Sequence, residues 1–188
     1  MKRYILTGAP GAGKTAILRQ LELDGFGVAE EAATDVIALW HARGVDQPWL
    51  ETWFVDAIAA LQQQRQIRTA NLPDSIQFHD RSVFCTAALA TYLGAPVTPG
   101  LAREIKRVRR DAIFESRVFF IRSLGFVAPT AARRISHEDA LRFEKVHEET
   151  YREFGFDLVF IESASVENRV ASIKMAVQEF ASQDHSKT

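Results

Sequence analysis

The sequence predicts an α/β fold in which a parallel β-sheet lies between two layers of helices. Two observations carry this prediction. Short apolar runs alternate with longer stretches of helical periodicity, which is the pattern of a parallel sheet covered on both faces. A glycine-rich loop at residues 8–15 also stands directly between the first apolar run and the first helical stretch. The chain has 188 residues, 47% of them hydrophobic, which is enough for a single three-layer domain over residues 1–181.

Five short runs are predicted strands because each is apolar or alternating and is bounded by turn residues. They lie at about residues 3–7, 27–30, 75–79, 117–121 and 157–161. The third run alternates into Asp80 and Arg81, so we expect charged groups at its carboxyl end.

The stretches between the strands are predicted helices because apolar residues recur at helical spacing and capping residues mark the ends. They lie at about residues 13–23, 31–42, 49–70, 83–93, 98–113 and 136–154, with a last helix after Ser165. Thr98 with Pro99 begins one helix, and the capping box of Ser136 and Asp139 begins another. The polar segment 182–188 is predicted to be a flexible tail.

The loop at residues 8–15 has the full pattern G-x-x-x-x-G-K-[ST] of a phosphate-binding loop. Such a loop must turn several backbone N–H groups inward, and Gly8 and Gly13 permit the backbone angles that this requires. The helix after Gly13 directs its positive end at the anion. Lys14 is expected to reach the β and γ phosphates, and Thr15 to give its hydroxyl to Mg²⁺. The predicted nucleotide site comprises Gly8, Ala9, Pro10, Gly11, Ala12, Gly13, Lys14, Thr15 and Ala16.

Acidic residues follow the second and third predicted strands, where the carboxyl ends of parallel strands line a ligand crevice. Asp80 is expected to hold Mg²⁺ together with Thr15; the alternative is that Asp80 caps the next helix. Either Glu30 or Glu31 is expected to orient or deprotonate an acceptor hydroxyl, unless both only stabilise the dipole of the next helix. Glu31 is the preferred candidate because we expect Glu30 to point to the opposite face.

Arginines near the phosphate site are candidates for stabilising transferred charge. Arg81 adjoins Asp80, and Arg122, Arg133 and Arg134 bracket an irregular segment at residues 122–135. A segment that closes over the site would exclude water from phosphoryl transfer, and its arginines would meet the charge that develops there. The alternative is a solvated loop.

A basic stripe of Arg103, Lys106, Arg107 and Arg110 lies along one predicted helix. Such a stripe is ordinarily a solvated face, although it would also suit an acidic substrate or an RNA backbone. Glu104 and Asp111 dilute the charge and no aromatic residue interleaves it, so the sequence disfavours nucleic acid. The histidines lack metal-ligand spacing, and Ser82 and Cys85 have no identifiable catalytic triad.

The composition excludes several classes of protein. A net charge of −1 provides no field that favours nucleic acid or a membrane surface. Cys85 is the only cysteine, which excludes a disulfide framework. No apolar run approaches the length of a membrane span, and no signal peptide precedes the first strand. We expect a cytoplasmic protein without membrane contact, as a monomer or a dimer.

The residues at 8–15, Glu30 to Ala33, Asp80-Arg81-Ser82 and the arginines before Ser136 resemble the kinase-like branch of P-loop NTPases. Nearly the whole chain resembles a family of small predicted ATPases in the AAA-domain set, related to nicotinamide riboside kinase domains. The resemblance implies the strand order 2-3-1-4-5, an acceptor-side helical region at residues 31–71 and a lid at residues 122–135. Deoxynucleoside kinases look similar, with a glutamate and an acid-Arg-Ser triplet that match Glu31 and Asp80-Arg81-Ser82. Family members often carry an arginine where this chain has Thr34.

Together these features predict an ATP-dependent phosphotransferase that moves the γ-phosphoryl group of Mg-ATP to a hydroxyl or phosphate of a small molecule. ATP is favoured over GTP because no [NT]-K-x-D motif is present. The expected catalytic residues are Lys14, Glu31, Asp80, Arg81, Arg133 and Arg134, with Thr15 and Asp80 at Mg²⁺. Two alternatives share the phosphate site: a regulatory ATPase or switch without an acceptor, and an RNA or polynucleotide kinase.

Overall fold

The sheet has five parallel strands in the order β2-β3-β1-β4-β5, which confirms the expected topology. The structure, a computed structural model, describes residues 1–125 and 136–185. The strands are β1 (Lys2–Thr7), β2 (Gly27–Ala29), β3 (Ile76–Asp80), β4 (Arg117–Ile121) and β5 (Asp157–Ile161). Because the first strand is central, its carboxyl end has β3 on one side and β4 on the other.

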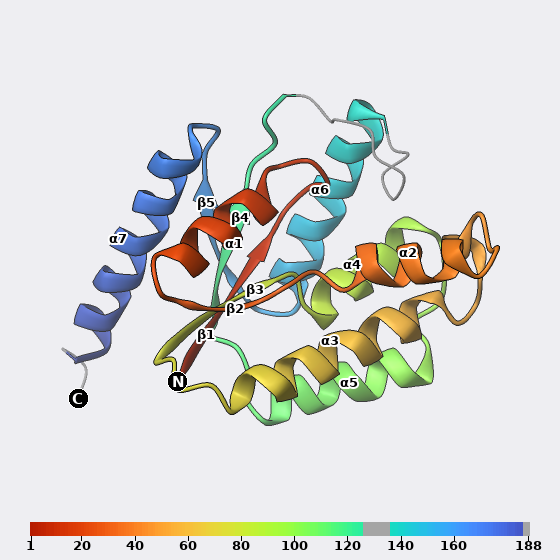
Figure 1. The fold of residues 1–188 in the computed structure, drawn as a ribbon, viewed down its shortest axis with the longest axis horizontal. Helices are drawn as coiled ribbons and strands as arrows, with labels where there is room; N and C mark the ends of the chain where they lie inside the picture. The colour runs from red at the N-terminus through yellow and green to blue at the C-terminus, as the bar shows by residue number, and fades with distance from the viewer. Residues whose placement is uncertain (126–135, 186–188) are drawn as a thin grey trace.

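Seven α-helices and one short 3₁₀ helix connect and cover the strands in the described part of the chain (Figure 1). The α-helices are α1 (Lys14–Leu23), α2 (Ala33–Ala42), α3 (Phe54–Ala70), α4 (Val83–Tyr92), α5 (Pro99–Arg110), α6 (His137–Glu153) and α7 (Val166–His185), and the 3₁₀ helix is η1 (Pro48–Leu50). None of the helices within the described ranges combines the length and the apolar character that a membrane crossing requires.

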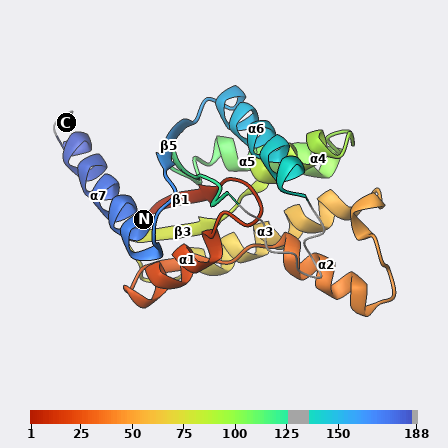
Figure 2. The ribbon, with the colours of Figure 1, turned by 90° about the horizontal axis from the view of Figure 1, so that it is seen from above.

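Helix α2 and the chain that leads from it to α3 extend beyond the sheet on one side of the molecule (Figure 2). This extension has its own hydrophobic cluster, in which Val36 and Ile37 of α2 pack against Phe54 and Ile58 of α3. The rings of Trp40 and Trp53, with 4.1 Å between their centroids, pack against this cluster. The extension and α3 together make up most of residues 31–71, for which the sequence predicted a helical region.

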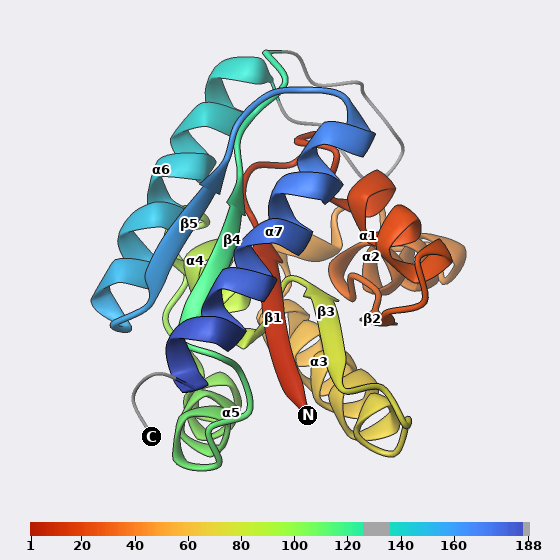
Figure 3. The ribbon, with the colours of Figure 1, turned by 90° about the vertical axis from the view of Figure 1, so that its left-hand side faces the viewer.

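Helices cover both faces of the sheet (Figure 3). Alternating side chains of the strands pack against these two helical layers. Tyr4 and Leu6 of β1 belong to the core under α1 and α7. Ile5, which points the other way, belongs to the core under α4, α5 and α6. Side chains that alternate between two buried faces explain why the strands read as nearly continuous apolar runs.

Hydroxyl caps begin four helices. The side chains of Thr98, Ser136 and Ser165 accept hydrogen bonds from the backbone N–H groups of Leu101, Asp139 and Asn168 respectively, as the sequence predicted. The fourth cap is Ser82, whose Oγ accepts from the N–H of Phe84 at the start of α4. Since Ser82 caps α4, Asp80 does not have that role.

Four predicted boundaries differ from the structure. The helix expected at 49–70 begins only at Phe54, because Glu51 after η1 has extended backbone angles. The helix expected at 31–42 begins at Ala33, which leaves Glu31 in a non-helical segment. Helix α5 ends at Arg110 rather than near residue 113. Helix α7 continues to His185, so residues 182–185 are helical rather than part of a flexible tail.

We predict that Gly8→Ala destabilises the protein far more than Gly25→Ala. Both glycines have positive φ angles, +122° and +89°. A Cβ at position 8 would clash with the carbonyl oxygen of Ile121, whereas one at position 25 would meet nothing within 4 Å. Urea unfolding should therefore show a loss of about 3 kcal/mol for Gly8→Ala and about 1 kcal/mol for Gly25→Ala. Equal losses would contradict the close approach of the loop to β4.

Candidate active site

The phosphate-binding loop joins β1 to α1, and three of its glycines have backbone angles that other residues rarely adopt. Gly8, Gly11 and Gly13 have φ angles of 122°, 83° and 84°. Gly13 occupies the N-cap position of α1 without any side-chain cap, so the first N–H groups of the helix remain available to a ligand. The loop therefore has the backbone conformation that the sequence pattern predicts.

Arg169 of α7 fixes the loop from behind. Its guanidinium group is buried and donates to the carbonyl oxygen of Ala12 at 2.8 Å and to that of Arg122 at 2.8 Å. These two bonds join the phosphate-binding loop to the carboxyl end of β4. The side chain thus holds the loop in place.

Lys14 lies across the loop and is buried. Its Nζ atom donates to the carbonyl oxygens of Gly8 and Ala9 at 3.1 and 2.7 Å. Burial, followed by the nearby positive charge of Arg81, lowers the pKa of Lys14 to about 8. An anionic ligand in the loop would add negative charge beside this ammonium group and raise its pKa.

Thr15 and Asp80 meet beside the loop. The Thr15 hydroxyl donates to Asp80 Oδ2 at 3.3 Å, because the pairing of Leu6 with Asp80 aligns the ends of β1 and β3. The second carboxylate oxygen, Oδ1, is buried and has no hydrogen-bond partner within the described ranges. Burial raises the pKa of Asp80 above its ordinary value. A hydroxyl and an under-coordinated carboxylate fit Mg²⁺, which prefers oxygen ligands.

The described residues contain no group of three or more His, Cys, Asp or Glu side chains able to hold a metal ion. A magnesium ion at Thr15 and Asp80 would therefore need further oxygen ligands from the nucleotide and from water, as is usual for this ion.

Glu31, and not Glu30, faces the loop. Arg81 Nε donates to Glu31 Oε1 at 2.7 Å, and the Thr34 hydroxyl donates to Oε2 at 2.6 Å. Burial favours the protonated carboxyl, but Arg81 and Thr34 hold the pKa of Glu31 below its ordinary value. Glu30 instead forms an ion pair with Arg19. Arg65 of α3 donates to the carbonyl oxygens of both glutamates and so fixes the backbone that aims them.

Arg81 is held by its backbone and by its side chain. Its φ angle of 72° is unusual for a residue with a Cβ, and its N–H donates to the carbonyl oxygen of Leu6 at 3.0 Å. Its guanidinium group lies between Glu31 and His147, with the NH1 atom 2.9 Å from His147 Nε2. Acidic neighbours, Glu31 first, raise the pKa of Arg81 despite its burial. Arg81 is therefore a fixed positive charge beside the loop.

A cavity of about 840 Å³ adjoins the loop. Lys14, Thr15, Glu31, Asp80 and Arg81 line its polar end. The walls beyond them are mostly apolar and come from α2, η1, α3, α4 and α6: Ile37, Trp49, Phe54, Ile58, Leu89, Leu93, Tyr92 and Phe143. Gln62 and Thr86 add a polar spot on this wall, where the Thr86 hydroxyl donates to Gln62 Oε1 at 2.9 Å. One cavity thus connects the predicted phosphate residues with the helical region at 31–71.

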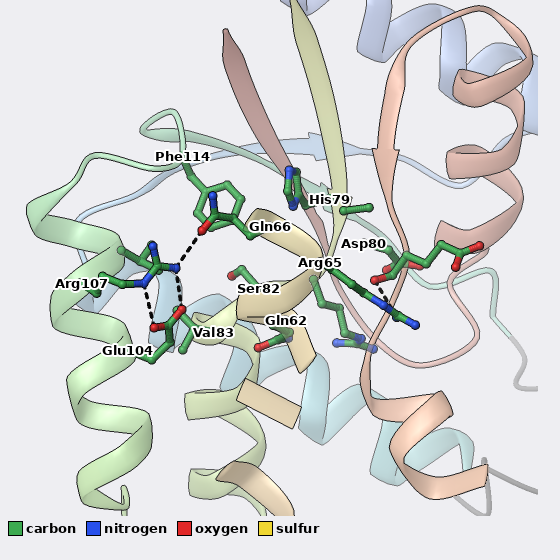
Figure 4. A pocket seen from close by; sticks show the side chains of 14 residues that line it. Gln62, Arg65, Gln66, His79, Asp80, Ser82, Val83, Glu104, Arg107 and Phe114 are labelled. Atoms are coloured by element: carbon green, nitrogen blue, oxygen red, sulfur yellow. Dashed lines mark hydrogen bonds and ion pairs between the residues drawn. The ribbon is translucent and has the colours of Figure 1, made fainter. Parts of the chain in front are cut away.

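A second, much smaller chamber of about 20 Å³ lies behind Asp80, between the end of β3 and helices α3 and α5 (Figure 4). It has room for about one water molecule. Burial lowers the pKa of His79 in its wall to about 3, so this imidazole is neutral. Across the chamber, Arg107 donates to Gln66 at 2.8 Å and to Glu104 at 2.7 Å (Figure 4). Arg107 thus belongs to an internal network, and the expectation of a uniformly solvated basic stripe is wrong at this position.

The structure brings together the residues at 8–15, Glu31, Asp80 and Arg81. Arg133 and Arg134 lie outside the described residues, as does most of the segment at 122–135. Arg122, at the start of that segment, forms ion pairs with Glu144 and Glu148 and lies over the ring of Phe160. Sequence reasoning missed Arg65 and His147, because no local pattern indicates that either would contact the loop after β2 or β3.

These features define the class of protein: an α/β P-loop domain. The chain belongs to a family described as an AAA domain, whose model matches residues 3–169. No protein with a curated description matches the sequence.

Solved structures of other proteins share this fold. The chain of the NadR protein in complex with NR superposes with a TM-score of 0.69 at 20% identity, over 95% of this chain and 50% of that chain. Deoxyadenosine kinase from M. mycoides with bound dCTP superposes with a TM-score of 0.66 at 13% identity, over 95% of this chain and 100% of that chain. The present chain thus spans about half the length of the NadR chain. At such low sequence identity, these superpositions establish a shared fold and nothing more.

We predict that nucleotide binding takes up a proton above about pH 8. Without a ligand the pKa of Lys14 is about 8, and bound phosphates would raise it. The affinity for MgADP should therefore fall up to about tenfold between about pH 7 and about pH 9, as Lys14 loses its proton in the free protein. Titration calorimetry in two buffers of different ionisation enthalpy measures the uptake. Lys14→Met should abolish it, and equal heats in both buffers for the unmodified protein would refute the assignment.

Proposed function

We propose that the protein transfers the γ-phosphoryl group of Mg-ATP to a hydroxyl group of a small, uncharged, nucleoside-like molecule. The observation that carries the proposal is that Glu31 and Arg81 line the same cavity as Lys14 and Thr15. A phosphate-binding loop alone would suit any NTPase. A carboxylate beside it, in a cavity with a large apolar part, is what a kinase requires for an acceptor.

The loop and its neighbours would bind the polyphosphate. The N–H groups at the start of α1 and the Lys14 ammonium group supply positive charge, and Thr15 and Asp80 would hold Mg²⁺. The ion, when bound, neutralises charge on the phosphate oxygens. Lys14 would exchange its two carbonyl partners, Gly8 and Ala9, for phosphate oxygens.

Glu31 and Arg81 would act on the transferred group and its acceptor. Since its pKa is lowered, Glu31 is ionised at neutral pH and accepts a hydrogen bond from the acceptor hydroxyl, and then its proton. The guanidinium group of Arg81, which already contacts Glu31 at 2.7 Å, would stabilise the charge that develops between donor and acceptor. The ion pair thus fixes the position of the base, Glu31, relative to the positive charge of Arg81.

The wall of the cavity supports an uncharged, partly aromatic acceptor. Phe54, Tyr92 and Phe143 provide aromatic surface, and the amide of Gln62 provides hydrogen-bonding capacity beside Thr86. Among the described residues that line the cavity, the only cations are Lys14 and Arg81, both at the phosphate end. This distribution favours a hydroxyl acceptor over a phosphate acceptor. The structures of a deoxyadenosine kinase and of a NadR protein with NR support an acceptor of nucleoside type.

The proposal is tested by a screen of nucleosides, vitamins and sugars for acceptor-dependent conversion of ATP to ADP. We expect turnover with at least one nucleoside-like compound. Lys14→Ala should lower kcat by about 100-fold or more, because it removes charge from the transferring phosphoryl group. Lys106→Ala, which removes an exposed lysine of α5, is the control and should retain activity. Slow hydrolysis of ATP that no compound accelerates would instead favour the regulatory ATPase.

A matched pair of neighbouring substitutions tests the acceptor-side acid. Glu31→Gln should lower kcat by about 100-fold or more with a smaller effect on the KM for ATP, because it removes the proton acceptor. Glu30→Gln should change kcat less than about threefold, because an exposed ion pair with Arg19 contributes little. Equal kcat values for the two variants in a steady-state assay would exclude Glu31 as the base.

A further inference from the structure

His147 of α6 is a fully buried titratable residue that the proposed reaction does not use. Its relative exposure is 0%. Its ring packs against Phe143, which lines the large cavity, with 4.3 Å between the ring centroids. Its two nitrogens contact different partners: Nδ1 lies 2.9 Å from the carbonyl oxygen of Phe143, and Nε2 lies 2.9 Å from the NH1 atom of Arg81.

These two contacts fix the protonation state of the imidazole. A carbonyl oxygen only accepts, so Nδ1 must carry the hydrogen; a guanidinium nitrogen only donates, so Nε2 must present its lone pair. His147 is therefore neutral, with its proton on Nδ1. Burial, followed by the charge of Arg81, also lowers the pKa of His147 well below its ordinary value.

The contact with His147 restricts Arg81 on the side opposite Glu31. The Nε–H group of Arg81 points at Glu31 and its NH1 group at His147, so the guanidinium plane is fixed by two bonds from different nitrogens. With the Glu31 bond alone, the group would still rotate about that contact. The backbone of Arg81 is anchored as well, through its N–H bond to Leu6 and its positive φ angle.

We propose that His147 is a positioning residue that orients the Arg81 guanidinium group toward the transferring phosphoryl group, by accepting a hydrogen bond at Nε2. This inference rests on the proposed function, because it assigns Arg81 to the transferred charge. A buried neutral histidine is well suited to this task, since it binds the guanidinium group without neutralising its charge. A carboxylate in its place would reduce the positive charge that the phosphoryl group meets.

The test needs no knowledge of the acceptor. In the presence of aluminium fluoride, bound MgADP forms a complex that mimics the phosphoryl group during transfer. The gain in ADP affinity on adding aluminium fluoride therefore measures the contacts that the protein makes with the transferring phosphoryl group. His147→Asn and His147→Gln form a matched pair of buried amides. The shorter asparagine can retain the bond to Phe143 but does not reach Arg81, whereas the oxygen of glutamine can occupy the position of Nε2.

We expect the two variants to differ in the gain of ADP affinity that aluminium fluoride produces. His147→Asn should lose about tenfold or more of the aluminium fluoride gain, while the affinity for MgADP alone changes less than about threefold. His147→Gln should keep most of the gain. In an Arg81→Ala background, His147→Asn should produce no further loss, because the histidine acts through that arginine. Thermal unfolding of each variant with saturating MgADP verifies that it is folded.

Two results would overturn the inference: a full gain in His147→Asn, or an additional loss when His147→Asn is combined with Arg81→Ala. A third result would contradict the proposed function as well as the inference: an unmodified protein that binds MgADP but gains no affinity from aluminium fluoride. If the unmodified protein gains ADP affinity from aluminium fluoride and either of the first two results is found, only the inference about His147 fails.

Discussion

The register between β1 and β3 is the constraint on which the site depends. Leu6 pairs with Asp80, and the next residue, Arg81, donates its N–H to the carbonyl oxygen of Leu6 at 3.0 Å. The ladder therefore ends where the phosphate-binding loop begins, and it places an acid and an arginine beside Thr15 and Lys14. A shift of one residue would turn both side chains to the opposite face of the sheet. Such a shift would also move Tyr4 and Leu6 of β1 into the core that Ile5 fills, and Ile5 into the core that they fill.

Two basic and two acidic side chains meet at the phosphate end of the cavity. Lys14, Arg81, Glu31 and Asp80 all line this end. Their pKa shifts follow from this arrangement. Burial is the largest influence at Lys14, Asp80 and Glu31, but at Glu31 the charges of Arg81 and Lys14 and the hydrogen bonds from Thr34 and Arg81 together outweigh it and lower the pKa. A nucleotide would add several negative charges to this site. The N–H groups of the loop, the Lys14 ammonium group and Mg²⁺ at Thr15 and Asp80 would offset them.

The parts of the fold and site that the sequence predicted are those with local signals. The phosphate-binding loop has fixed spacing, the strands are apolar runs, and Ser136 and Thr98 cap helices by accepting from residues three positions away. The break before Phe54 was missed because the apolar residues at 49–61 keep a helical period even though Glu51 is extended. The contacts of His147 with Arg81 and of Arg65 with the Glu31 backbone join residues 66 and 34 positions apart. Such pairs are set by tertiary packing, and neither residue is distinguished by its neighbours in the chain.

Every role assigned to the site requires that the loop between β1 and α1 binds the phosphates of a nucleotide together with Mg²⁺. This binding can be measured by titration calorimetry of the folded protein with ADP in the presence of Mg²⁺. We expect saturable binding of one nucleotide per chain that weakens when Mg²⁺ is chelated. Absence of binding heat with ADP, ATP and GTP, on protein whose folding is verified by circular dichroism and at more than one temperature, would contradict it.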